Sequence, residues 1–115
     1  MRRTGLLLVI CLLWPSAGRA DDSSAAPMDT YNKAITFFQA GRWNAAREYL
    51  HQYLAEYSDT PLYVTCLYDL AYCYQQLKDR PQAVLLYHKV IDQAQGDDAF
   101  WADMAQKRLE EMENP

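Results

Sequence analysis

The chain has 115 residues, the length of one small domain, and half of them are hydrophobic. Fifteen acidic residues against eleven basic ones give a formal net charge of −4 at pH 7. Because a negative surface repels phosphate backbones and anionic lipid headgroups, the composition argues against nucleic-acid and membrane-surface partners.

Residues 1–20 have the pattern of a cleaved secretory signal peptide. Arg2 and Arg3 precede a short apolar run, and Gly18-Arg19-Ala20 places small residues where a signal peptidase reads. The apolar stretch of about ten residues is too short to span a membrane, which takes roughly twenty. Cleavage would remove three of the eleven basic residues, which leaves eight against fifteen acidic ones and a formal net charge of −7. We therefore expect an acidic, exported, periplasmic domain that is not inserted in the membrane.

Residues 21–27 are small or polar and lack periodicity, so they predict a disordered leader before a domain over 28–115. Within that domain apolar residues recur at helical spacing and predict five helices, over about 29–40, 43–57, 62–77, 81–95 and 99–112. The breaks carry cap chemistry: Gly41 ends the first helix, Pro81 lies in the first turn of the fourth, and Asp98 caps the fifth. The fold class is all-α.

One pattern occurs twice, thirty-seven residues apart, as Ala46-x3-Leu50-x2-Tyr53 and Ala83-x3-Tyr87-x2-Val90. A single helix pair cannot bury its own apolar face, so such repeats predict a stacked α-solenoid.

Small residues mark the expected helix crossings, because only a small side chain lets helix axes approach to roughly eight to ten ångströms. These positions are Ala34, Ala46, Ala71, Ala83 and Ala105. The large side chains predicted to fill the core beside them are Phe37, Leu50, Tyr53, Leu54, Leu67, Leu70, Tyr74, Val84, Tyr87, Val90, Ile91, Trp101 and Met104.

The chain resembles the tetratricopeptide repeat family. The clearest copy of its pattern is Leu67-x2-Leu70-Ala71-x2-Tyr74, followed by Ala83-x3-Tyr87 on the next helix. A poorer copy begins Thr30-x2-Lys33-Ala34-x2-Phe37, where Lys33 replaces Leu, as a first repeat with one solvent-facing flank tolerates. A third copy begins Trp101-x2-Met104-Ala105 and stops after one helix. The resemblance implies a helix-turn-helix solenoid of two repeats plus a C-terminal capping helix.

Among exported members, the chain is similar to the periplasmic Tol-Pal accessory protein and to outer-membrane assembly proteins of this family. The residues 54–58, before a proline, carry this likeness, although the chain lacks the coiled coil of the former and the lipid-bearing cysteine of the latter. The resemblance implies a non-enzymatic adaptor for a protein or peptide partner in cell-envelope assembly or secretion. The alternative is a structural subunit of an envelope complex, or a homodimer, whose aromatic face is permanently buried.

The first helix of each pair lines the concave side of such a solenoid, so its outward residues predict the partner-binding groove. Rings supply contact area and amides satisfy a peptide backbone. The alternative is that some of these rings fill core space. The predicted partner-binding residues are Tyr31, Ile35, Phe38, Gln39, Thr65, Tyr68, Tyr72, Gln75 and Gln76, with Gln106 on the closing helix.

Chaperone-binding members of the family hold a partner's terminal carboxylate with Lys and Asn on this face. Here Tyr31, Ile35, Tyr68 and Tyr72 stand at those places, so a carboxylate clamp is not expected.

We expect no catalytic site, no cofactor and no metal. No catalytic motif is recognisable, and His51 and His88 fall on the outer face of second helices, too few for a zinc site. Cys66 and Cys73 stand seven residues apart on one helix, about 10.5 Å, which is too far for a disulfide. Cys73 is expected to be buried, whereas the sequence leaves open whether Cys66, nearer the helix start, is exposed and forms a bridge with a second chain.

Overall fold

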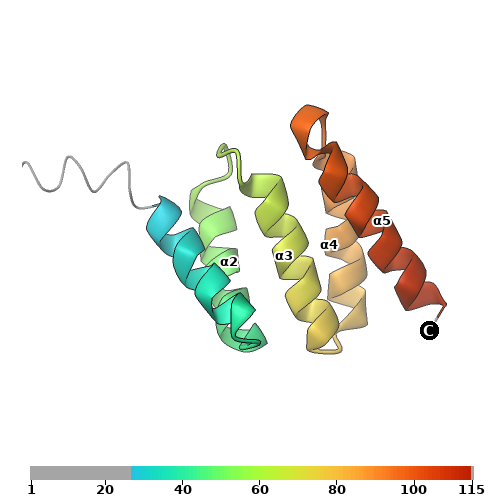
Figure 1. Cartoon of the computed structure of the whole chain (residues 1–115), viewed down its shortest axis with the longest axis horizontal. Helices are drawn as coiled ribbons and strands as arrows, with labels where there is room; N and C mark the ends of the chain where they lie inside the picture. Colours follow the sequence, from blue (N-terminus) through green and yellow to red (C-terminus); the bar gives the residue numbers. More distant parts are fainter. Residues whose placement is uncertain (1–26, 115) are drawn as a thin grey trace, which may run out of the picture.

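The computed structural model describes residues 27–114, and all regular structure in that range is helical. A leading helix covers residues 27–39, and it is followed by α2 (Trp43–Glu56), α3 (Tyr63–Gln76), α4 (Arg80–Gln93), the single 3-10 turn η1 (Gly96–Asp98) and α5 (Ala99–Glu113). The leading helix, α3 and α5 form one layer, and α2 and α4 form a second layer behind it (Figure 1). The predicted all-α repeat solenoid is confirmed.

The predicted signal peptide and the leader up to residue 26 lie outside the described residues, and residue 27 already belongs to the leading helix. Between residues 27 and 114, no helix has the length and apolar character needed to cross a bilayer.

The helix ends follow the cap residues in most places. Gly41 has φ +74°, and the backbone N–H groups of Gly41 and Arg42 donate to the last carbonyls of the leading helix at 3.0 and 2.9 Å. Lys78 takes the same left-handed conformation after α3, with φ 66°. Pro81 lies in the first turn of α4, where Asp79 caps the helix by accepting from the N–H of Gln82 at 3.3 Å.

Asp98 precedes α5 as predicted, but its side chain makes no capping hydrogen bond, so that prediction is wrong. The physical reason is the backbone conformation of η1, which ends at Asp98. The turn leaves Asp98 in a helical conformation, with φ −87° and ψ 0°, whereas a capping side chain needs a non-helical backbone.

The core follows the predicted pattern of small residues at the helix crossings. All five alanines, at positions 34, 46, 71, 83 and 105, have no exposed surface. The large side chains predicted beside them are either fully buried or packed against the buried cluster. One continuous core therefore runs from the leading helix to α5.

The helix α3 lies at the centre of this core. Eight of its fourteen residues are buried, including Cys66, Cys73 and the carboxylic acid Asp69. Cys66 has no exposed surface, and its thiol points at the carbonyl oxygen of Leu50 at 3.7 Å. The sequence left the exposure of Cys66 open, and the structure buries it, because α3 is covered on both sides by its neighbours. Both thiols are free, and burial raises the pKa of each.

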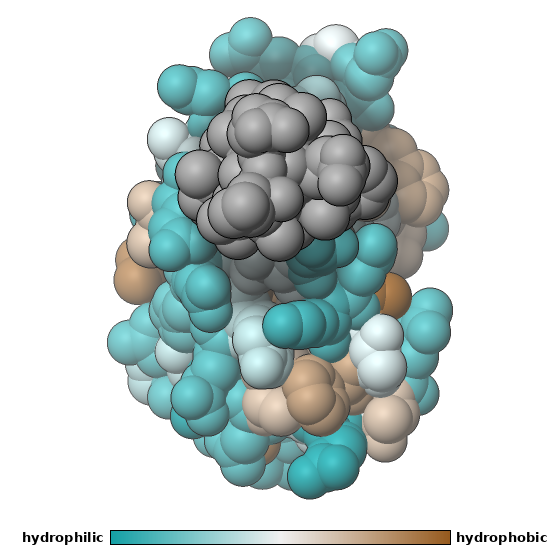
Figure 2. Space-filling view, turned by 90° about the vertical axis from the view of Figure 1, so that its left-hand side faces the viewer, coloured by the Kyte–Doolittle hydropathy of each residue, from teal (hydrophilic) through white to brown (hydrophobic). Residues whose placement is uncertain are grey.

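The end of the array that carries the leading helix is mainly hydrophilic on its coloured surface, with a small apolar area low in the view (Figure 2). At this end Phe37 stacks on Tyr49 with ring centroids 5.6 Å apart. Arg42 lies 5.6 Å from the Phe37 ring centroid, and Lys33 lies 6.0 Å from that of Tyr49. Lys33 is exposed, as expected for the solvent-facing flank of a first repeat.

Candidate functional site

A cavity of about 470 Å³ opens on the layer formed by the leading helix, α3 and α5. We call it the groove. Its lining combines five aromatic rings with one carboxylate and one guanidinium, and it consists of Phe38, Gln39, Trp43, Tyr68, Asp69, Tyr72, Trp101, Met104 and Arg108.

The rings of the groove hold one another in place. Phe38, Trp43 and Tyr72 form a three-way cluster, with centroids 5.2 to 5.6 Å apart. On the α5 side, the Tyr68 and Trp101 rings lie 5.0 Å apart. Edge-to-face and tilted contacts of this kind are favourable for aromatic pairs. The groove therefore presents fixed apolar walls on both sides of α3.

Arg108 of α5 contacts the α3 residues that line the groove. Its Nε donates to the hydroxyl of Tyr68 at 3.0 Å, and its Nη1 forms an ion pair with Glu111 at 3.1 Å. The guanidinium carbon lies 5.0 Å from the centroid of the Tyr72 ring, within cation–π range. The hydrogen bond to Tyr68 is the main reason why the pKa of Arg108 is raised above its ordinary value. The guanidinium is thus engaged by three groups of its own chain.

Asp69 is the only charged residue that is buried among the described ones, with 8% of its surface exposed. The hydroxyl of Tyr31 donates to its Oδ2 at 3.3 Å. Burial raises the pKa of Asp69 to about 7, against the lowering effect of that hydrogen bond. The pKa of Tyr31 is in turn raised, first by burial and then by the nearby carboxylate. The floor of the groove therefore contains a carboxyl group that titrates near neutral pH.

Four of the residues predicted from sequence line the groove, namely Phe38, Gln39, Tyr68 and Tyr72. Tyr31 instead lies behind the lining, where it holds Asp69 and packs on Tyr53 with ring centroids 5.7 Å apart. The remaining predicted residues, Ile35, Thr65, Gln75, Gln76 and Gln106, lie outside the lining.

The amide of Gln75 is occupied within the chain, because its Oε1 accepts a hydrogen bond from Tyr87 at 2.7 Å. Tyr68 also has a second role, since only 6% of its surface is exposed and its ring packs on Tyr87 with centroids 5.6 Å apart. The interpretation that some rings fill core space therefore applies to Tyr68, although it reaches the groove.

Sequence reasoning missed five lining residues: Trp43, Asp69, Trp101, Met104 and Arg108. Trp101 and Met104 were predicted only as core. The sequence could have indicated Arg108, because it stands three residues after Ala105. The clearest repeat copy has the aromatic Tyr74 at the equivalent position. The sequence could also have indicated Asp69, because it is the only charged residue in the predicted helix over 62–77.

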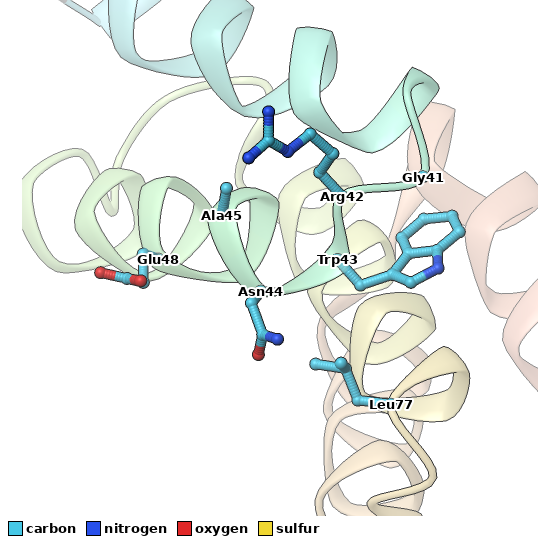
Figure 3. A pocket seen from close by; sticks show the side chains of 7 residues that line it. All are labelled: Gly41, Arg42, Trp43, Asn44, Ala45, Glu48 and Leu77. Carbon is cyan, nitrogen blue, oxygen red and sulfur yellow. The ribbon is translucent and has the colours of Figure 1, made fainter.

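A second hollow, of about 490 Å³, lies at the turn between the leading helix and α2. It is lined by residues 41–45, Glu48 and Leu77, and Figure 3 shows the Arg42 and Trp43 side chains pointing away from each other there. The two hollows differ little in size, so their lining decides between them. Gly41, Arg42 and Glu48 are exposed and no charged group of this hollow is buried, so the groove is the better candidate site.

Nothing within residues 27–114 resembles a metal centre, since no three His, Cys, Asp or Glu side chains gather closely enough to hold an ion. His51 and His88 are both exposed, as the sequence predicted. His51 shares a 2.8 Å hydrogen bond between its Nε2 and the hydroxyl of Tyr74.

The stacked helix pairs and the groove on their first helices define a helical-repeat scaffold. Residues 33–109 match a family described as tetratricopeptide repeat. The chain belongs to the tetratricopeptide repeat family. No curated protein and no solved structure gives a significant match to it. Domains of this family generally mediate protein–protein interaction through their concave surfaces and are typically non-catalytic scaffolds.

Proposed function

We propose that this chain is an exported, non-enzymatic adaptor that binds a protein or peptide segment in the groove during cell-envelope assembly or secretion. The observation that carries the proposal is the convergence of five rings from four helices on one cavity. Tyr and Trp at a concave surface provide apolar contact area together with polar atoms, as protein-binding sites do.

The sequence of residues 1–20 supports the location. Its charged start, short apolar run and small residues before Asp21 are those of a secretory signal, and we propose a periplasmic destination. Sequencing the N-terminus of the protein recovered from the periplasm of a bacterial host tests this. A mature chain that begins at Asp21 supports export, whereas a full-length cytoplasmic product contradicts it.

Photo-crosslinking of the full-length chain in cells tests the groove. The photoreactive residue p-benzoylphenylalanine replaces Gln39, which lines the groove and is exposed, or His88, an exposed residue of α4 outside the groove lining. We expect position 39, and not position 88, to crosslink a distinct protein. Adding Tyr72→Ser should abolish that crosslink. Equal crosslinking from both positions would contradict binding in the groove.

The alternative is a structural subunit or homodimer that keeps the groove permanently covered. It is favoured by Phe100, which is 60% exposed and packs on Trp101 at the groove with ring centroids 5.1 Å apart. The apolar surface of the groove therefore continues onto Phe100, outside the lining. Such extended apolar surface is a feature of permanent interfaces. Light scattering on the purified mature chain separates the two functions. A monomer at high concentration supports the adaptor, and a dimer lost on Tyr72→Ser supports the homodimer.

A further inference from the structure

We propose that the groove recognises a basic side chain of the bound segment, a Lys or an Arg, whose cation pairs with the carboxylate of Asp69. The inference rests on the proposed function, because it states the chemistry of the segment that occupies the same groove.

The carboxylate of Asp69 lacks a full set of partners in the described chain. Its one donor is the hydroxyl of Tyr31, on Oδ2, and the single ion pair of the described residues joins Arg108 to Glu111 instead. A buried carboxylate without an opposite charge is costly, because it has lost most of its water. An incoming ammonium or guanidinium group would supply the missing charge.

Within residues 27–114, the titratable groups around Asp69 supply no free cation. The leading helix contributes Tyr31, and α3 contributes the thiols of Cys66 and Cys73, whose raised pKa keeps them neutral. The charged group that α5 brings to the groove is Arg108, which already pairs with Glu111 and donates to Tyr68. The residue that α2 brings to the lining, Trp43, carries no charge.

The rings around Asp69 suit the rest of a basic side chain. The methylene stem of Lys or Arg covers apolar surface, and its cation is attracted to the face of an aromatic ring. The groove already contains such a contact, since the guanidinium of Arg108 lies 5.0 Å from the ring centroid of Tyr72. Phe38 and Trp43, which cluster with Tyr72, offer further ring surface on the same wall. The net charge of −4 also attracts a basic segment from a distance.

Such recognition has to depend on pH. Burial places the pKa of Asp69 at about 7, so about half of the carboxyl groups are ionised at neutral pH. Because a bound cation favours the ionised form, binding releases a proton and lowers this pKa. Affinity for a basic segment is therefore expected to rise between pH 6 and pH 8.

A displayed library of random nonapeptides tests the inference on the purified mature chain. Asp69→Asn removes the charge and keeps an oxygen that accepts from Tyr31. Tyr31→Phe is the matched control, because it removes that hydrogen bond and keeps the carboxyl group, and selection at pH 8 favours the ionised form of that group. We expect Lys or Arg to be enriched on the wild-type chain and on Tyr31→Phe, and not on Asp69→Asn. Circular dichroism confirms that each variant is folded.

The affinity of one enriched peptide then measures how much its basic residue contributes to binding. Replacing its basic residue by citrulline or norleucine should weaken binding to the wild-type chain at least about tenfold at pH 8, as expected for a buried charge pair. The same replacement should change binding to Asp69→Asn by less than about twofold, which is the signature of a coupled pair.

The failures of the two proposals are distinguishable. Peptides that bind through Tyr72 without a basic residue, or that bind Asp69→Asn as well as the wild-type chain, contradict the basic recognition and leave the adaptor intact. An enriched basic peptide that binds no better at pH 8 than at pH 6 also contradicts it. If the wild-type chain enriches no peptide, both proposals are wrong.

Discussion

The helices α3 and α5 carry the same repeat pattern and have different surroundings. Leu70 matches Met104 and Ala71 matches Ala105, whereas Arg108 stands where α3 has the aromatic Tyr74. Yet eight residues of α3 are buried and only two of α5, Ala105 and Leu109. The small residue is buried in both helices, whereas the large residues are fully buried only in α3.

The difference follows from the number of neighbours. The helix α3 packs against both α2 and α4. The helix α5 packs on α4 and α3, and no further helix lies beyond it in residues 27–114 (Figure 1). Equivalent positions thus form core in the middle of the array and groove wall at its end. A repeat pattern predicts which face of a helix is apolar, and the neighbours decide whether that face is covered.

The largest expected effect tests this comparison at equivalent positions. Leu70→Ala should lower the free energy of unfolding by about 3 kcal/mol, because Leu70 is only 1% exposed and its truncation leaves a cavity in the core. Met104→Ala should cost about 1 kcal/mol, since the site is partly open to solvent. Urea unfolding followed by circular dichroism measures both. Equal costs would show that α5 is packed as tightly as α3.

The second prediction concerns the buried charge of α3. The folded chain raises the pKa of Asp69 from 3.8 to about 7, so between these values the folded state holds a proton that the unfolded state has lost. The stability contributed by Asp69 is therefore greatest below pH 3.8 and is lost as the pH rises to about 7. Because Asn does not titrate, the stability of Asp69→Asn relative to the wild-type chain should increase by about 2 kcal/mol from pH 5 to pH 8.

Urea unfolding of both proteins at the two pH values measures this difference, in which the contributions of all other carboxylates cancel. Asp103 on α5 is exposed, and Asp103→Asn is the matched control for the loss of one carboxylate. A difference that stays constant from pH 5 to pH 8 would mean that Asp69 is already ionised in the folded protein at pH 5.

The third prediction concerns the contact between the two helices. Tyr68→Phe removes the acceptor of the Arg108 Nε, which joins α3 to α5, and should cost about 1 kcal/mol. Tyr72→Phe keeps the ring over which Arg108 lies and should change stability by less than about 0.5 kcal/mol. Urea unfolding measures both variants. A larger loss for Tyr72→Phe would show that its hydroxyl carries the contact.

The sequence predicted the helices to within one to three residues at their ends, because the apolar period and the residues Gly41 and Pro81 act locally. The five alanines at the crossings were predicted for the same reason. The sequence could not decide whether Cys66 is exposed, because a helix between two neighbours is covered over most of its circumference, which the period of one helix does not reveal.

The groove was predictable only in part. Phe38 and Tyr72 lie on the outward face of first helices, which the repeat pattern identifies. Trp43 and Arg108 come from the start of α2 and from the closing helix α5, and they reach the cavity through long side chains. Their position depends on how the elements stack, so spacing within one helix could not place them. The burial of Asp69 has the same tertiary origin, because Tyr31 covers it from another helix.

The smallest expected effect compares the starts of two helices. Asp79 caps α4 through a partly exposed 3.3 Å hydrogen bond to the N–H of Gln82, whereas Asp98 before α5 makes no such bond. Asp79→Ala should therefore cost about 0.5 kcal/mol, the low end for a lost cap. Asp98→Ala should cost less, because only its charge near the helix start is lost, an effect that salt screens. Urea unfolding at low and high salt separates the two contributions. If Asp98→Ala is the more damaging change at high salt, then Asp98 caps α5 in solution and η1 is not the stable start of that helix.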